Sequence, residues 1–168
     1  MVHAAWSTAA QAALAPFLDG GGALSEEGLV RTGRAADPMR QARETLLNGP
    51  KAEPPASITF PDKDGHERNA GRLRWWLAGA TGLTWRDAFL GPPDPESLPA
   101  DPVPEALLGA ADPDARPVVF GHYWMHWPLG ALSGRHACVD ASVAMDGRLA
   151  AYRFSGERVI DPDRFVSV

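Results

Sequence analysis

The five histidines of this chain are the residues best suited to hold a transition metal, because the neutral imidazole ring is a common metal ligand. His122 and His126 share the segment Gly-His-Tyr-Trp-Met-His-Trp, and His122 follows Gly121 at the end of an apolar run. Glycine lets a backbone bend sharply or approach a ligand closely, so a Gly-His pair at a strand end is a candidate binding site. On spacing alone, packing within an aromatic cluster is the favoured interpretation of the pair.

The other histidines have different surroundings. His66 lies in the turn-rich segment Asp-Gly-His-Glu, where a charged turn facing water is the favoured interpretation, and His136 follows Arg135. His3 lies in Val-His-Ala-Ala-Trp, close to the amino terminus. A free amine, two peptide nitrogens and this imidazole would form the tetragonal nitrogen set that Cu²⁺ and Ni²⁺ prefer. We expect purified chain to bind copper there, without biological meaning.

Three helices are expected in the first third of the chain, and each has a start signal. Ser7 precedes an Ala-rich segment over residues 8–18, Ser25 precedes two glutamates, and Asp37 precedes a proline. Asn48, followed by Gly and Pro, ends the third helix. These helices must position whatever chemistry the later strands carry.

Two further features precede the C-terminal strands. Residues 58–60 and 72–76 flank the turn-rich residues 62–65, which predicts a β-hairpin. Residues 91–117 contain eight of the 16 prolines. Proline lacks a backbone donor and restricts the residue before it, so this segment is predicted to be a linker that is neither regular helix nor central strand.

The last part of the chain favours short strands separated by turns. An apolar run covers 117–123, small and β-branched residues follow at 137–144, and further strand-like segments cover 149–154 and 158–160. Asp146-Gly147 is typical of a tight hairpin. We predict an antiparallel β-meander of three or four strands, which needs a second layer to cover one face.

Composition excludes several classes of protein. A single cysteine forms no internal disulfide and no cysteine-based zinc cluster. The net charge of −5 gives no reason to expect non-specific nucleic-acid binding, and no apolar run is long enough to span a membrane. The sequence therefore predicts a soluble, cytoplasmic protein.

Three segments together resemble a known family. They are Phe-Gly-His-Tyr-Trp at 120–124, Ala-Cys-Val-Asp-Ala-Ser-Val-Ala at 137–144 and Leu-Ala-Ala-Tyr-Arg-Phe-Ser-Gly-Glu at 149–157. They look like the C-terminal part of bacterial calcineurin-like metallophosphoesterases of the serine/threonine phosphatase-like or diadenosine-tetraphosphatase-like subgroup. Val-His-Ala-Ala-Trp at 2–6 and Phe-Pro-Asp-Lys-Asp-Gly-His-Glu-Arg at 60–68 are also similar to that subgroup. The resemblance covers nearly the whole chain in order.

The resemblance implies a fold and a division of the chain. The expected fold is α+β, the C-terminal half of a calcineurin-like αββα sandwich, with an antiparallel β-meander and an N-terminal helical insert. Residues 1–168 would form a single partial domain. Within it, a helical segment and insert hairpin cover 1–90, the Pro-rich linker covers 91–117 and the meander covers 118–168.

The resemblance also implies roles for particular residues. His3 and His122 match the two late histidine motifs of the family and would be metal ligands, whereas Trp6, Tyr123 and Trp124 would line the substrate pocket. The complete family site holds two divalent metals, for which Mn, Fe or Zn is expected because imidazole suits them better than it suits Mg²⁺ or Ca²⁺. Whether this chain alone binds metal is left open, and no catalytic residue is assigned.

The chain departs from the family in motifs that matter for catalysis. It has no early Asp-x-His, no Asp-Arg-Gly and no Asn-His-Glu, the motifs that supply the bridging ligands and the histidine that protonates the leaving group. The simplest account is that the first half of the domain is lost or encoded separately, with Met1 an internal start.

Two hypotheses about function follow. The first is a fragment of a phosphoesterase, weak or inactive alone, whose complete enzyme hydrolyses a phosphate monoester or a dinucleoside polyphosphate, with a phosphorylated small molecule or nucleotide as substrate. The alternative is a non-catalytic protein-interaction module, or a subunit complemented by a separate N-terminal half.

Overall fold

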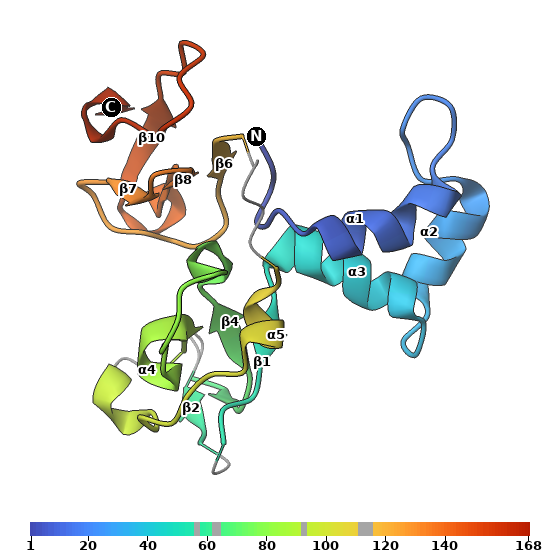
Figure 1. Cartoon of the computed structure of the whole chain (residues 1–168), viewed down its shortest axis with the longest axis horizontal. Helices are drawn as coiled ribbons and strands as arrows, with labels where there is room; N and C mark the ends of the chain where they lie inside the picture. Colours follow the sequence, from blue (N-terminus) through green and yellow to red (C-terminus); the bar gives the residue numbers. More distant parts are fainter. Residues whose placement is uncertain (56–57, 62–64, 92–93, 111–115) are drawn as a thin grey trace. The chain divides into compact units, whose positions relative to one another are not determined.

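The computed structural model describes residues 1–55, 58–61, 65–91, 94–110 and 116–168 and shows a mixed α+β protein (Figure 1). The chain forms two compact units. Ser7–Ala111 is named the helical unit, and Met1–Trp6 together with Asp112–Val168 is named the strand-rich unit. The first six residues thus fold with the C-terminal part of the chain. Within the described ranges, no helix combines the length and apolar character needed to cross a membrane.

Capped helices begin the helical unit, as the sequence predicted. They are α1 (Thr8–Leu14), α2 (Glu26–Gly33) and α3 (Pro38–Asn48). The Ser7 hydroxyl accepts a hydrogen bond from the Ala10 amide, the Ser25 hydroxyl accepts one from Gly28, and the Asp37 carboxylate accepts one from Met39. These side chains satisfy amide groups that have no partner inside the helix.

The first helix ends earlier than predicted. Helix α1 stops at Leu14 and continues as the 3₁₀ turn η1 (Ala15–Phe17). Pro16 explains the change, because proline inside an α-helix removes a hydrogen bond and clashes with the carbonyl four residues earlier. Leu18 then pairs with Leu24 across the glycine-rich turn.

Helix α3 packs against both α1 and α2 (Figure 1). Their shared core buries one small and one larger apolar side chain from α1 and from α3, with three partly buried side chains around them. The core residues are Ala10, Leu14, Met39 and Ala42, surrounded by Phe17, Leu24 and Leu46. This core contains no ionisable side chain.

Two small sheets follow in the helical unit. Strand β4 (Gly71–Leu73) lies between β1 (Lys51–Ala52) and β5 (Phe89–Leu90), antiparallel to both. Strand β2 (Phe60–Pro61) pairs with β3 (Glu67–Arg68) in a hairpin. The predicted hairpin partner, residues 72–76, is therefore wrong, because Leu73 is fully buried in the other sheet. Turn residues 62–64 lie outside the described residues.

The Pro-rich segment contributes to the core instead of serving only as a linker. The elements η2 (Trp75–Leu77) and α4 (Trp85–Ala88) precede this segment. The segment itself forms η3 (Pro95–Ser97) and a one-turn helix α5 (Glu105–Leu108). The expectation of no regular helix is corrected by α5, which starts directly after Pro104, where proline is tolerated. The core of this part consists of Phe60, Leu73, Trp85, Ala88, Phe89, Leu98, Val103 and Leu108.

Two three-stranded sheets make up the strand-rich unit. The first has the order β6-β8-β7, from β6 (Val118–Phe120), β7 (Ala131–Ser133) and β8 (His136–Cys138). Strands β6 and β8 are parallel, so the prediction of a wholly antiparallel meander is wrong. The long connection between them allows the chain to cross over, and β7 pairs antiparallel with β8 on its other side.

The second sheet has the order β11-β10-β9. Strand β9 (Asp140–Ala141) pairs with β10 (Arg148–Tyr152) across η4 (Val143–Met145) and the Asp146-Gly147 turn, which confirms the predicted hairpin there. Strand β10 also pairs with β11 (Phe165–Ser167), which follows η5 (Pro162–Arg164). The predicted strand at 158–160 is wrong, because Ile160 instead bonds to the Gly134 carbonyl.

Candidate metal centre

The amino-terminal segment lies along the end of strand β6. The Val2 amide donates a hydrogen bond to the Val119 carbonyl, and the Gly121 amide donates one to the His3 carbonyl, both at 2.9 Å. Ala4 and Ala5 that follow are buried. These contacts fix His3 beside the Gly121-His122 pair. The predicted amino-terminal copper site needs the Val2 peptide nitrogen as a ligand, so copper binding there would break the hydrogen bond from Val2 to Val119.

His122 is displayed on an unusual loop after β6. Its φ angle is 69° and that of Trp124 is 48°, in the left-handed region that side-chain-bearing residues seldom adopt. The neighbouring Tyr123 is buried, with its ring edge-on to Phe120 at a centroid distance of 5.6 Å. The loop therefore anchors Tyr123 in the core and leaves His122 half-buried and Trp124 exposed.

The structure brings the imidazole rings of His3 and His122 together. Their centroids are 5.1 Å apart and the ring planes are inclined by 40°. Two imidazoles that bind one tetrahedral ion at about 2.0–2.1 Å would have centroids about 5 Å apart. His3 is exposed and His122 is half-buried, so solvent reaches the pair.

The donor set of this pair is small. Among the residues that the structure describes, no group of three His, Cys, Asp or Glu side chains could hold a metal ion. Two nitrogens can fill two positions of one ion, but a two-metal phosphoesterase centre needs bridging oxygen ligands as well. The residues present therefore fit part of one metal site and do not fit the whole centre.

The three residues expected to line a substrate pocket are placed differently from one another. Trp6 and Trp124 expose 41% and 45% of their surface, whereas Tyr123 exposes 6%. Tyr123 thus offers little surface to a ligand. A substrate role for the three residues stays a prediction.

Cys138 and Asp140 lie on the strands behind the loop. Cys138 is buried, and this burial raises the pKa of its thiol to about 11, although hydrogen bonds from the Asp140 and Tyr123 backbones oppose the shift. The thiol is thus protonated at neutral pH and is a poor metal ligand. The Asp140 carboxylate accepts a hydrogen bond from the Ser142 amide at 3.1 Å.

Sequence reasoning missed how this Asp140–Ser142 turn serves the loop. The Met125 amide donates to the Asp140 carbonyl at 2.8 Å, and the Ser142 hydroxyl donates to the Met125 carbonyl at 3.0 Å. The Asp-x-Ser pattern is a signal for a local turn of this kind. Nothing in the sequence around Ser142 predicts that Met125 is the partner of its hydroxyl.

The remaining histidines do not join the pair. His126 is exposed, and the structure has no helix between β6 and β7 that would align it with His122. His136 places its Nδ1 atom 2.8 Å from the Ser133 hydroxyl. Burial, and then the charge of Arg135, lower the pKa of His136. His66 is exposed in the helical unit.

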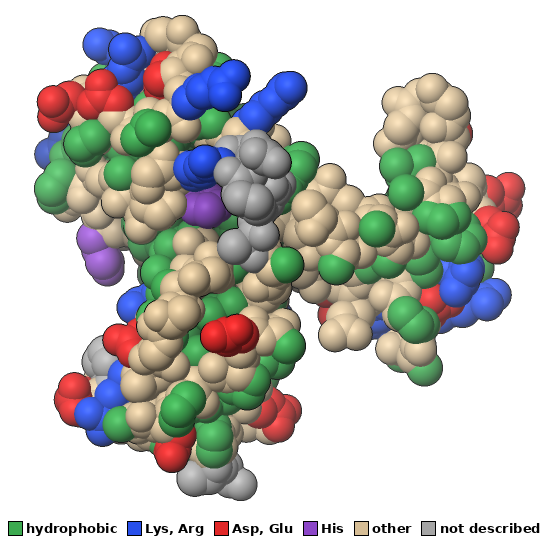
Figure 2. Space-filling view, in the orientation of Figure 1, with side chains coloured by type: hydrophobic (Ala, Val, Ile, Leu, Met, Phe, Trp, Pro, Cys, Tyr) green, Lys and Arg blue, Asp and Glu red, His purple; other side chains and the backbone are tan. Residues whose placement is uncertain are grey.

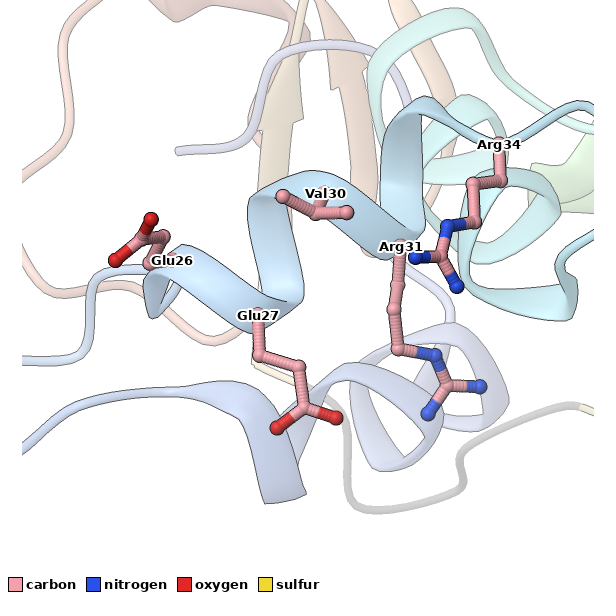
Figure 3. A pocket seen from close by; sticks show the side chains of 5 residues that line it. All are labelled: Glu26, Glu27, Val30, Arg31 and Arg34. Carbon is pink, nitrogen blue, oxygen red and sulfur yellow. The ribbon is translucent and has the colours of Figure 1, made fainter.

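A surface hollow lies on α2 (Figure 3). It is lined by Glu26, Glu27, Val30, Arg31 and Arg34. Arg31 forms an ion pair with Asp37 at 2.9 Å and also lies over the Phe17 ring. The hydrogen bond from Arg31 holds the pKa of the Asp37 carboxyl below its ordinary value. The two arginines share the hollow with two glutamates, so the hollow does not concentrate the positive charge that a phosphate would need.

Comparison with known proteins gives no relative: no family model, no curated protein and no solved structure matches this chain. The function is therefore argued from the histidine pair and its surroundings.

Proposed function

We propose that this chain is part of a metal-dependent phosphoesterase in which His3 and His122 supply two ligands to one divalent ion. The observation that carries the proposal is the 5.1 Å separation of their ring centroids. The two residues lie far apart in the sequence, and the family resemblance points to both as metal ligands. Their proximity supports that selection.

The donor chemistry supports a transition metal. Imidazole nitrogen suits Mn, Fe or Zn, whereas Mg²⁺ and Ca²⁺ prefer oxygen ligands. In a complete centre of this class, two metal ions activate a water molecule and neutralise the oxygens of a phosphate ester. This chain's own residues hold one ion at two positions and leave the remaining positions to carboxylates from elsewhere.

The proposal also covers the fold family and the motifs that a separate N-terminal half would supply. The structure is α+β, and the proposal takes it as the C-terminal half of a calcineurin-like sandwich on the strength of the family resemblance. A separate N-terminal half would carry Asp-x-His and Asn-His-Glu, and the substrate would be a phosphate monoester or a dinucleoside polyphosphate. The chain alone is then weakly active or inactive.

Metal binding is the first test. Calorimetric titration of the full chain with Zn²⁺ and with Mn²⁺ should give one site. His3→Ala and His122→Ala should each weaken binding at least tenfold, since one of two ligands is lost. His126→Ala is the matched control and should bind as the wild type does. Acetylating the amino terminus excludes the copper-type site, and equal losses for His122→Ala and His126→Ala would refute the assignment.

Activity is the second test. Hydrolysis of p-nitrophenyl phosphate and of diadenosine tetraphosphate should be near background with Mn²⁺ and this chain alone. It should rise when a polypeptide encoded upstream, containing Asp-x-His and Asn-His-Glu, is added. Strong hydrolysis by the chain alone that survives His122→Ala would overturn the site.

A second candidate function is favoured by one specific observation. Val143, Met145 and Leu149, on η4 and β10, each expose more than half of their surface, at 57%, 61% and 60%. Figure 2 shows hydrophobic side chains exposed among charged ones over the strand-rich unit. Contiguous apolar patches on a surface mark interaction sites, and these three side chains lie close together in the sequence. This candidate is a non-catalytic protein-interaction module, or a subunit complemented by a separate N-terminal half.

The interaction module has its own test. The isolated chain should self-associate in light scattering, because these side chains lack a covering layer in the residues described. Leu149→Glu should reduce that association without weakening Zn²⁺ binding. A clean monomer at high concentration would count against this candidate and leave the metal site unaffected.

A further inference from the structure

We propose that Ser142 is a positioning residue: its hydroxyl holds the loop that presents His122 to His3. The inference rests on the proposed function for its biological meaning, because the ligand is the same divalent transition metal. Ser142 itself does not contact that metal. It acts through Met125, which ends the loop.

Met125 is held through both of its backbone groups. Its amide donates to the Asp140 carbonyl at 2.8 Å, and its carbonyl accepts the Ser142 hydroxyl at 3.0 Å. The second bond is the only one of the two that a side-chain substitution can remove. It joins residues far apart in the sequence, so it restrains the loop relative to β9 and not merely its own turn.

The other end of the loop is held independently. The Val139 amide donates to the Phe120 carbonyl at 2.8 Å, and the Tyr123 backbone hydrogen-bonds to the buried Cys138 thiol. Phe120 is fully buried. One face of the loop is therefore fixed to β8 and the residue after it, and Ser142 closes the other end.

The loop needs such restraint because of its backbone. His122 and Trp124 both have positive φ angles, at 69° and 48°. Side-chain-bearing residues keep such angles only where the surrounding structure fixes them, and they concentrate at functional sites. If the Met125 end were released, the His122 ring would lose its fixed place beside His3.

Ser142 is itself held in the orientation that this role requires. Its φ angle is 58°, and its amide donates to the Asp140 carboxylate at 3.1 Å. The turn directs the hydroxyl towards Met125. Gly147 approaches Ser142 so closely that a Cβ atom there would meet the Ser142 carbonyl at 2.6 Å, which limits how the turn can rearrange.

The experiment compares two substitutions with a matched control in the full chain. Ser142→Ala removes the hydroxyl, and Ser142→Gly removes it while relieving the left-handed backbone, so at least the glycine variant keeps the fold. Ser97→Ala is the control, because the Ser97 hydroxyl also donates to a backbone carbonyl, that of Asp94, at 2.6 Å in the helical unit. The readouts are Zn²⁺ affinity and the NMR cross-relaxation between the His3 and His122 ring protons without metal.

We expect both Ser142 variants to bind Zn²⁺ about tenfold more weakly, as for other residues that orient a metal ligand. We also expect both variants to lose the ring-to-ring signal, while Ser97→Ala changes neither readout. Retention of the signal and the affinity in Ser142→Gly would overturn the inference, as would an equal loss in Ser97→Ala. If the wild type shows the ring-to-ring signal, Ser142→Gly loses it and the wild type binds no Zn²⁺, then the positioning role holds and the proposed function fails.

Discussion

The two units of this protein use their side chains in contrasting ways. The helical unit buries large apolar residues, among them Leu73, Trp85 and Phe89. The strand-rich unit buries small residues such as Ala4, Ala137 and Ala141 beside a few larger ones, Phe120 and Tyr123 among them. The strand-rich unit also contains all four non-glycine residues with positive φ in the part of the chain described.

This contrast indicates that the two units serve different purposes, one providing stability and the other positioning side chains. A well-filled core gives cooperative stability, whereas strained backbone is kept where a side chain must point in a particular direction. The histidine pair lies in the unit with the strained backbone and the smaller core. We infer that the site depends on a few anchoring residues more than on general packing.

The largest effect is expected when an anchor of the strand-rich unit is removed. Phe120→Ala should lower the free energy of unfolding by about 3–5 kcal/mol, because a fully buried aromatic ring leaves a cavity. Hydrogen exchange should accelerate over 118–167 and stay slow in α1 and α3. Leu73→Ala should accelerate exchange in β1, β4 and β5 and leave exchange over 118–167 slow. Faster exchange in both units for either variant would contradict the contrast.

A smaller loss is expected at the β9–β10 turn. Gly147→Ala would place a Cβ atom against the Ala141 carbonyl and the Ser142 backbone, so the turn must shift, at a cost of about 2–4 kcal/mol. Gly20→Ala in the helical unit is the control, because a Cβ there meets nothing within 4 Å. Equal melting temperatures for the two variants would show that this turn is not rigid.

Helix capping should matter less. Ser25→Ala should cost about 1 kcal/mol and reduce the helical circular dichroism, because the Gly28 amide loses its partner. Ser25→Asp should retain the stability and the circular dichroism of the wild type, since aspartate is also a favourable N-cap residue. Zn²⁺ affinity should be unchanged in either variant, and a loss of affinity would mean that the helical unit supports the metal site.

The smallest effect is a dependence of stability on pH. His136 has a pKa lowered by burial from its ordinary value of 6.5, so below pH 6.5 the unfolded chain binds more protons than the folded one. Its contribution therefore makes stability fall as pH drops from 6.5 towards the folded pKa. The free energy of unfolding, measured with urea at several pH values from 7.5 to 5, should depend less steeply on pH in His136→Asn than in the wild type. The same pH dependence in both proteins would remove His136 as the cause.

How much the sequence predicts differs between the units for physical reasons. Helix starts depend on neighbours within four residues, so Ser7, Ser25 and Asp37 were read correctly as caps. Strand pairing depends on distant partners. Accordingly the predictions of the partner of β2, of a wholly antiparallel meander and of a strand at 158–160 are wrong.

The candidate site shows the same limit. Gly121-His122 is a local signal for a candidate site, although spacing alone favours packing within an aromatic cluster. The packing of the amino-terminal segment on β6 is not local, and His3 was selected only through a family resemblance. The bond from Ser142 to Met125 had no local signal either, because nothing in the sequence near one residue specifies the other.

The most direct test of the central claim follows the imidazole nitrogens themselves. In a Zn²⁺ titration of acetylated chain observed by histidine ¹H–¹⁵N NMR, the ring signals of His3 and His122 should shift together and reach saturation at one ion per chain, while those of His126 and His66 stay in place. A shift of only one ring of the pair, or an equal response from His126, would contradict the claim that His3 and His122 bind one ion together.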